Sequence, residues 1–229
     1  MSEQCEANLS KPYSKGEYNK YNDTEQWIRI SEGCPHKHTY CRESFENPEL
    51  IVYPIPQIIR NVVKIMDMNL LCHPEAIDIL RKLGSIRVHG KKVKYELICG
   101  IDYRFLTKQI AWLLKHSGFV KIRMAWDLEF KFQKDIKKAI DLLKSVGYKD
   151  ITIFMICNWK IPYEINCMKL DLCKVWKVKV ADCYFDNQLS PNFESIYWSL
   201  EDMKRFRAKV RKHNQLVNFG IDPEYPEVG

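Results

Sequence analysis

The sequence lacks the long apolar runs from which membrane-spanning helices are built. It contains no stretch of about 18 consecutive apolar residues. Its polar N-terminal stretch, MSEQCEANLSKPYSKGEYNKYND, has none of the apolar core that a secretory signal requires. These two absences predict a protein that is cytoplasmic and has no membrane partner.

The chain also has little excess of charge of one sign. The 36 Lys and Arg residues outnumber the 29 Asp and Glu residues by only seven. Such a mild excess permits an anionic partner but is equally typical of an ordinary solvated surface. The aromatic content of 12%, with apolar residues spread evenly, excludes extended disorder.

Cysteine, by contrast, is abundant for a cytoplasmic protein. The nine cysteines are an odd number, and the chain of 229 residues is long enough to build its own core. Without an export signal, a disulfide scaffold is therefore not expected. Free thiols, metal ligation or iron–sulfur chemistry are the better interpretations.

After a loose polar arm at residues 1–24, short apolar segments alternate with segments of helical periodicity. The apolar segments recur about every 30 residues, which is the length of one βα unit. The predicted strands are Trp27–Ser31, Val62–Met68, Val93–Cys99, Phe119–Trp126, Asp150–Cys157 and Val175–Tyr184. This alternation predicts an α/β protein in which a parallel sheet is covered by helices.

The predicted helices have recognisable ends. Thr107 is a plausible N-cap, and Gly118 suits the left-handed residue that follows a helix. Pro74 and Gly84 mark the start and the end of an earlier helix in the same way. Ser199 with Asp202 resembles a capping box at the start of a C-terminal helix. In PYEINCMKLDLCKVW the expected apolar face is Ile165, Met168, Leu172 and Val175.

Six βα units are too few for an eight-unit barrel, so a six-stranded open barrel or a doubly wound sheet is expected. In both architectures the functional groups gather at the carboxyl ends of the strands. We expect residues 25–190 to form this core, with a C-terminal helix and tail over residues 191–229 packing on it.

The most informative stretch follows the first predicted strand and reads EGCPHKHTYCRE. Within it, Cys34, His38 and Cys41 are separated by three and then two residues. Three soft or borderline ligands inside eight residues can surround one metal centre. A zinc site built from Cys34, Cys41 and either His36 or His38 would use the same residues.

This loop resembles the signature of the radical S-adenosylmethionine (SAM) enzymes, C-x3-C-x2-C after the first strand. Cys34 and Cys41 match the outer cysteines, Tyr40 matches the aromatic residue before the last cysteine, and His38 replaces the middle cysteine. The resemblance extends to the βα units over about residues 25–190, and it implies a partial (β/α)6 open barrel of the TIM type, with parallel strands and outer helices.

The resemblance also implies a chemistry. Members of the family hold a four-iron, four-sulfur cluster, bind SAM to its open iron and generate a 5′-deoxyadenosyl radical that abstracts hydrogen from a substrate. The protein is accordingly identified as a radical SAM-type enzyme with Cys34, His38 and Cys41 as metal ligands. Because imidazole is neutral where thiolate is anionic, His38 is expected to raise the cluster potential and to impair activity.

The resemblance places the SAM pocket after the next strands. Beside Tyr40, the candidates are Asn69, which replaces the usual Gly-Gly-Glu-like segment, Asp102 with Arg104 in GIDYRFLT, and Asp127. Arg104 would pair with the methionine carboxylate and Asp127 with a ribose hydroxyl. Structural alternatives are a turn cap for Asn69, a surface ion pair for Asp102 and Arg104, and a solvated loop carboxylate for Asp127.

No catalytic residue and no substrate can be assigned from the sequence; the substrate is a small molecule, a peptide or RNA. A ferredoxin or flavodoxin is the expected electron donor, and a monomer is expected. Two other functions compete. One is a non-catalytic iron–sulfur or zinc protein, and the other is a basic nucleic-acid-binding module whose basic helix reads MKRFRAKVRKHNQLVNFG.

Overall fold

The computed structural model describes residues 16–36, 38, 40–41, 49–127, 130–184 and 197–221. Its strands are β1 (Tyr18–Tyr21), β2 (Gln26–Arg29), β3 (Ser31–Glu32), β4 (Ile51–Val52), β5 (Val62–Ile65), β6 (Arg87–Val88), β7 (Lys91–Lys92), β8 (Lys94–Leu97), β9 (Ile122–Ala125), β10 (Ile151–Cys157) and β11 (Lys179–Tyr184). The α-helices are α3 (Ala76–Ser85), α4 (Lys108–Ser117), α5 (Gln133–Ser145), α6 (Tyr163–Val175) and α7 (Leu200–Phe219). Parts of the predicted arm, core and tail lie outside the described residues.

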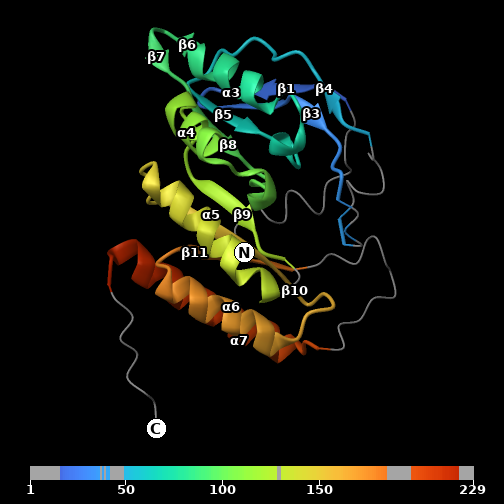
Figure 1. Cartoon of the computed structure of the whole chain (residues 1–229), viewed down its shortest axis with the longest axis vertical. Coiled ribbons are helices and arrows are strands. Elements are labelled where there is room, and N and C mark those ends of the chain that lie inside the picture. The colour runs from blue at the N-terminus through green and yellow to red at the C-terminus, as the bar shows by residue number, and fades with distance from the viewer. Residues whose placement is uncertain are drawn as a thin grey trace.

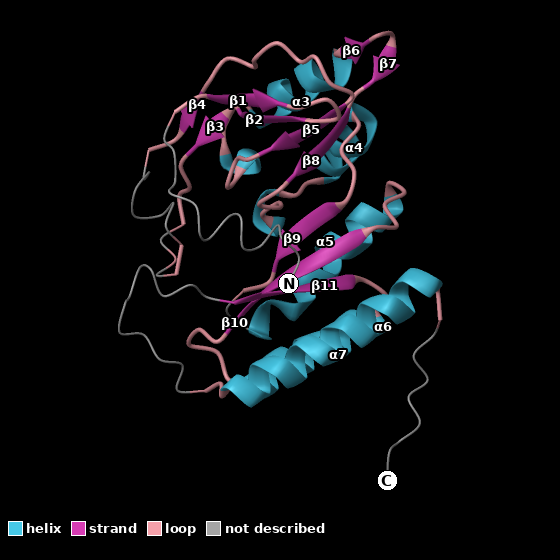
Figure 2. Ribbon diagram, turned by 180° about the vertical axis from the view of Figure 1, so that it is seen from behind, coloured by secondary structure: helices cyan, strands magenta, loops and turns pink. Residues whose placement is uncertain are grey.

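Six parallel strands stand side by side in the order of the chain. β2, β5 and β8 are hydrogen-bonded neighbours, and so are β9, β10 and β11. Parallel bridges between Tyr95 and Phe119 and between Ile101 and Met124 join β8 to β9. The four-residue β1 pairs with β2 in the antiparallel direction. Figures 1 and 2 show these strands with the helices packed against them, which confirms the predicted α/β class with parallel strands.

Each predicted strand segment overlaps one of the six parallel strands, and each observed strand is shorter than predicted. The largest difference is at the last segment, where α6 continues through Val175 and β11 begins only at Lys179. Residues 18–21, within the predicted arm, form β1. Between the sheet and the helices the core is apolar, with side chains such as Ile28, Val63 and Met124 fully buried.

The predicted caps of two helices are confirmed. Thr107 accepts a hydrogen bond from the Ile110 amide, and Gly118 ends α4 in the left-handed conformation. Ser199 and Asp202 form the capping box of α7. The prediction for α3 was wrong at both ends, because the helix begins two residues after Pro74 and contains Gly84. A Cβ atom at Gly84 would lie 2.7 Å from Ser117 Oγ, so this glycine permits close packing against α4.

The predicted apolar face of α6 was also wrong. Met168 is 46% exposed and Val175 is 75% exposed, whereas Asn166 and Lys169 are fully buried beside Leu170 and Cys173. Asn166 Nδ2 donates to the Ile156 carbonyl over 3.0 Å. The buried face of α6 therefore carries polar side chains, because carbonyl oxygens at the end of β10 and just after β9 accept their hydrogen bonds.

The C-terminal helix α7 packs against both β11 and α6 (Figure 2). Phe206 and Val210 are buried on its inner face. The Asn214 side chain accepts from the Val180 amide over 2.9 Å and donates to the Val180 carbonyl over 2.7 Å. Of the helices in the described part of the chain, none is both long and apolar enough to span a membrane.

Candidate functional site

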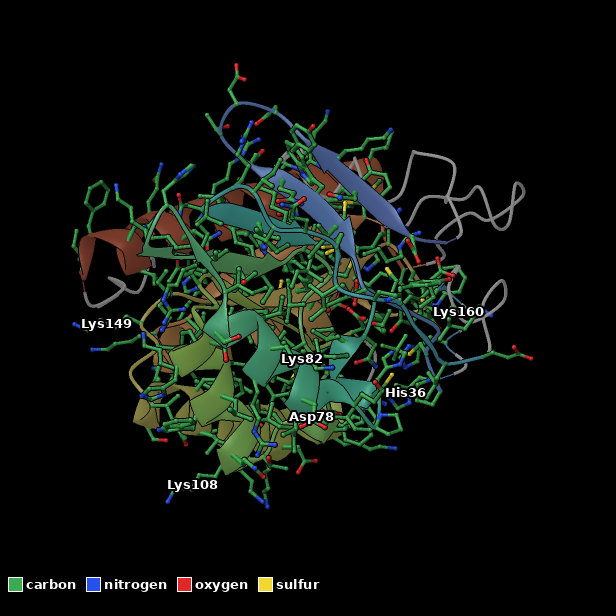
Figure 3. The ribbon with its side chains drawn as sticks, turned by 90° about the horizontal axis from the view of Figure 1, so that it is seen from above. His36, Asp78, Lys82, Lys108, Lys149 and Lys160 are labelled. Carbon is green, nitrogen blue, oxygen red and sulfur yellow. The ribbon has the colours of Figure 1, made fainter. Side chains whose placement is uncertain are left out.

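The segments that follow five parallel strands meet at one side of the molecule. They contribute, in chain order, Cys34 with its neighbours, Asn69, Asp102 with Arg104, Asp127 and Trp159. In Figure 3, His36 and Lys160 lie on this side, and Lys149, which precedes β10, lies on the opposite side. The predicted gathering of polar side chains at the carboxyl ends of the strands is therefore present in the structure.

Asp102 is the centre of a hydrogen-bond network. It accepts two bonds from the Arg104 guanidinium, at 2.7 and 2.9 Å, and one from Asn69 Nδ2 at 3.2 Å. His36 Nε2 lies 2.7 Å from its second oxygen. Burial by itself raises the pKa of Asp102, but the hydrogen bonds and charge of Arg104 outweigh burial and hold that pKa below its usual range. Asp102 is thus an anion that orients Arg104 and His36.

Asn69 links this network to the first cysteine of the motif. Its Nδ2 atom lies 3.5 Å from Cys34 Sγ, within range for an N–H···S hydrogen bond. The Asn69 side chain makes no capping bond to the short helix that follows it. Its Oδ1 atom is buried and has no partner among the described residues. A buried oxygen without a hydrogen-bond donor can accept a hydrogen bond from a bound ligand.

Asp127 is tied to the motif loop from the other side. The Tyr40 hydroxyl donates to Asp127 Oδ2 over 2.8 Å, and burial raises the pKa of both groups. Behind them, the fully buried Lys169 donates to the carbonyls of Trp126 at 3.1 Å and of Asp127 at 2.6 Å. Burial lowers the pKa of Lys169 to about 8. Lys169 thereby fixes the backbone that carries Asp127.

The side chains at positions 36, 38 and 40 form a row of stacked rings. His38 stacks on His36 with the ring centroids 5.5 Å apart and on Tyr40 at 5.1 Å. Phe105 and Trp159 flank the row, at 5.8 Å from His36 and 6.3 Å from Tyr40. Burial, followed by the positive charge of Arg104, lowers the pKa of His38. The His38 imidazole is therefore held neutral between two rings.

Both motif cysteines, Cys34 and Cys41, carry thiols outside any disulfide and are partly exposed. Gly33 turns the chain into the motif at φ +93°, and a Cβ atom there would lie 1.9 Å from the Glu49 carbonyl oxygen. Within the described residues, no three His, Cys, Asp or Glu side chains are arranged to hold a metal ion. The donor chemistry of two thiols and a neutral imidazole suits a soft metal centre. Ligation by Cys34, His38 and Cys41 stays a prediction.

No protein-family model matches the chain, and no curated protein matches its sequence. Solved structures do match. The chain shares the fold of a radical S-adenosylmethionine methyltransferase. That enzyme is TsrM from Kitasatospora setae, matched at a TM-score of 0.54, 11% identity and 69% coverage of this chain in a structure with cobalamin and a 4Fe–4S cluster bound.

A second TsrM structure, with tryptophan substrate and the SAM analogue aza-SAM bound, matches with the same TM-score, identity and coverage of this chain. The present chain spans only 34% and 35% of the two matched chains, about a third of their length. At this level of identity the likeness establishes a common fold.

Within this fold, hydrogen bonds connect six of the eight predicted site residues. Cys34, Asn69, Asp102 and Arg104 form one network, and Tyr40 contacts Asp127. His38 lies in the ring stack, and its meeting with Cys34 and Cys41 around one metal stays a prediction. Both guanidinium contacts of Arg104 go to Asp102, so its pairing with a ligand carboxylate stays a prediction.

Sequence reasoning missed two contributors, Lys169 and Trp159. The available signal for Lys169 was a lysine four residues before Cys173 on the same helical face. That signal is weak, because a lysine in such a position usually lies at the edge of the apolar stripe with its ammonium in water. Only the carbonyls beyond β9 show that the ammonium is buried.

Proposed function

We propose that this protein is a radical SAM-type iron–sulfur enzyme built on a partial (β/α)6 barrel. The observation that carries the proposal is the convergence of Cys34, Asn69 and Asp102 in one network at the carboxyl ends of parallel strands. The fold shared with TsrM supports it. The sequential order of the six parallel strands supports an open barrel over a doubly wound sheet, in which the order would reverse.

Cys34 and Cys41 are the thiolate ligands of the proposed cluster. His38 is the third donor by its place in the motif; its ring stacks between His36 and Tyr40, which leaves its in-plane nitrogens at the edge of the stack. When bound, the four-iron, four-sulfur cluster supplies the electron that cleaves SAM to a 5′-deoxyadenosyl radical. The N–H of Asn69 stabilises negative charge on Cys34 sulfur, in the way that hydrogen bonds to sulfur tune such centres.

The protein's own groups bind and orient SAM in this proposal. The buried Oδ1 atom of Asn69 accepts from the methionyl ammonium, and the anionic Asp102 lies beside it. Arg104 offers its planar fork to the methionyl carboxylate while Asp102 holds it in place. Tyr40 and Trp159 close the opposite side with apolar rings and limit the access of water. Asp127 accepts from a ribose hydroxyl.

The electron donor and the substrate are further parts of the proposal. The cluster needs an external one-electron donor of the ferredoxin or flavodoxin type. The enzyme acts as a cytoplasmic monomer on a substrate that the strand-end loops recognise. That substrate is a small molecule, a peptide or RNA.

The deciding experiment is anaerobic reconstitution with iron and sulfide, followed by metal, sulfide and 5′-deoxyadenosine analysis. We expect about four irons per chain, broad visible absorbance, and 5′-deoxyadenosine released on reduction with SAM. Cys34→Ala and Cys41→Ala should abolish iron incorporation. Cys167→Ala is the matched control, since its thiol lies on α6, outside the motif loop, beside Lys209 and Tyr163.

Two results would refute the proposal. Iron content that does not change in either motif variant would show that the cluster is not held by this loop. A purified protein that contains one zinc, takes up no iron and releases no 5′-deoxyadenosine would identify a non-catalytic metal protein on the same fold. In that case His38 would keep its place in the ring stack and would not bind a cluster.

A further inference from the structure

A strongly basic face lies opposite the candidate site, at the amino ends of the parallel strands. Four connections lead into β8, β9, β10 and β11 there, over residues 86–94, 118–121, 146–150 and 176–179. They contain a single carboxylate, Asp150. Their eight cations are Arg87, Lys91, Lys92, Lys94, Lys121, Lys149, Lys177 and Lys179. We call this set the basic edge, and we include in it the neighbouring cations Lys115, Lys144, Arg211 and Lys212 and the ring pair Trp112 and His116.

The carboxyl ends of β5, β8, β9 and β10 do not share this charge. The described connections over residues 66–75, 98–107, 126–127 and 158–162 carry four carboxylates against two cations, Arg104 and Lys160. Figure 3 shows Lys149 on the opposite side from Lys160 and His36. Among these connections, positive charge is therefore concentrated on the face away from the candidate site.

Three lysines on this face donate hydrogen bonds to neutral backbone carbonyls of the next βα unit. One precedes β8, and the other two lie in the last turns of α4 and α5. Lys92 binds the carbonyl of His116, Lys115 that of Gly147 at 3.0 Å, and Lys144 that of Trp176 at 2.5 Å. Helix C-termini favour nearby cations, which accounts for where these lysines lie. A carbonyl carries only a partial charge, so these contacts leave the positive charge of each lysine largely uncompensated.

Two cations of the basic edge do have carboxylate partners. Lys121 pairs with the buried Glu96 and Lys179 with Asp150, at 2.7 and 2.9 Å.

The C-terminal turns of α7 add two more exposed cations, Arg211 and Lys212. The neighbouring His213 fixes these turns to the start of β11, because its Nε2 lies 2.8 Å from the Val178 carbonyl. The β6–β7 hairpin and the C-terminal ends of α5 and α7 lie along the same side in Figure 1.

An exposed aromatic pair stands within the basic edge. Trp112 is 51% exposed and stacks on His116, with the ring centroids 3.9 Å apart and the planes inclined by 17°. The Lys92 ammonium binds the His116 carbonyl. A flat aromatic face bordered by lysines is the arrangement on which single-stranded nucleic acids stack their bases while the backbone follows the cations.

We propose that the basic edge binds a single-stranded nucleic acid, whose phosphates contact its lysines and of which one base stacks on Trp112. Protein interfaces of stable complexes have an apolar centre. Here most side chains are cationic, and the exposed large apolar ones are scattered over α4 and two helix ends: Trp112 on α4, Val175 at the end of α6, and Phe219 and Ile221 at the end of α7. A polar, strongly positive surface is typical of nucleic-acid interfaces. The binding site is independent of the cluster, on the opposite face.

The test is fluorescence anisotropy of a labelled oligouridine with the full-length protein at low and moderate salt. Lys91→Gln, Lys94→Gln and Lys149→Gln are combined, because none of these side chains makes a hydrogen bond or ion pair to another described group. The control combines Lys108→Gln, Lys134→Gln and Lys160→Gln, which remove the same charge from exposed positions away from the basic edge. Iron content, measured in parallel, monitors the proposed function separately.

The wild-type affinity should fall steeply with salt, and the triple variant should bind more weakly with a slope of log K against log salt reduced by about 2. Trp112→Ala should weaken binding by roughly tenfold or more. The control triple variant should bind like the wild type. Absence of binding at low salt, or an equal loss in the control, would overturn the proposal. Binding to polyglutamate as tight as to oligouridine, with no effect of Trp112→Ala, would also overturn it, in favour of an acidic protein partner.

Discussion

Asp67 gives the sharpest prediction of stability, because it is a carboxyl group buried without a cation bonded to it. It is fully buried, and its two oxygens accept from the Ile30 amide at 3.0 Å and from the Ser31 hydroxyl at 2.6 Å. Burial raises its pKa to about 7, and these hydrogen bonds offset only part of that increase. The folded protein therefore binds a proton that the unfolded chain, with a pKa of 3.8, releases.

The pH dependence follows from this difference. Between pH 4 and pH 7 the folded state holds more protons than the unfolded state, so the free energy of unfolding falls as pH rises. From pH 5 to pH 8 the loss from this one group is about 2.6 kcal/mol, at 1.36 kcal/mol for each pH unit of difference. Asp67→Asn replaces the protonated carboxyl with a neutral group of the same shape, so this pH-dependent loss should disappear in the variant.

The assay is urea unfolding of the wild type and of Asp67→Asn at pH 5, 6, 7 and 8, with equal m-values required for the comparison. The free energy of unfolding of the variant, relative to that of the wild type, should increase from pH 5 to pH 8. Ser31→Ala serves as the control, because it removes the hydroxyl and leaves the carboxyl in place. A difference between Asp67→Asn and the wild type that stays constant across this range would refute the reasoning.

Three further predictions concern other positions. His38→Cys should raise 5′-deoxyadenosine formation per cluster, because thiolate lowers the cluster potential and 59 mV is a tenfold change for one electron; equal formation in both proteins would contradict this. Gly33→Ala should lower stability by at least about 1–2 kcal/mol in urea unfolding, from the left-handed backbone and the Glu49 carbonyl; an unchanged midpoint would count against it. The buried His73, whose pKa is lowered by burial, should make the wild type lose stability as pH falls below 6.5, and His73→Leu should remove that loss in thermal melts.

Much of the fold is predictable because its signals are local. Thr107, Gly118 and the Ser199–Asp202 capping box act on backbone groups within a few residues of themselves, so the sequence contains both partners of each interaction. The βα period likewise follows from short-range alternation of apolar segments. These elements place the strand ends in order, and that order brings Asn69 and Asp102 to Cys34.

The failures have a common physical cause, which is dependence on distant partners. Gly84 has the sequence appearance of a helix end, yet its place inside α3 is explained only by the approach of Ser117 from α4. Lys169 has the sequence appearance of a solvent-exposed lysine. In the structure, the carbonyls of the two residues that follow β9 accept its hydrogen bonds.

The two hydrogen bonds between Asn214 and Val180 have a consequence for assembly. An outermost strand normally exposes main-chain donors and acceptors that can recruit a strand from another molecule, which is a common route to aggregation. The amide of Asn214 binds both main-chain groups of Val180, as a neighbouring strand would, and α7 packs against β11. Loss of α7 would therefore leave β11 with unpaired main-chain groups at its edge. This helix thus protects the molecule against self-association and also completes its core.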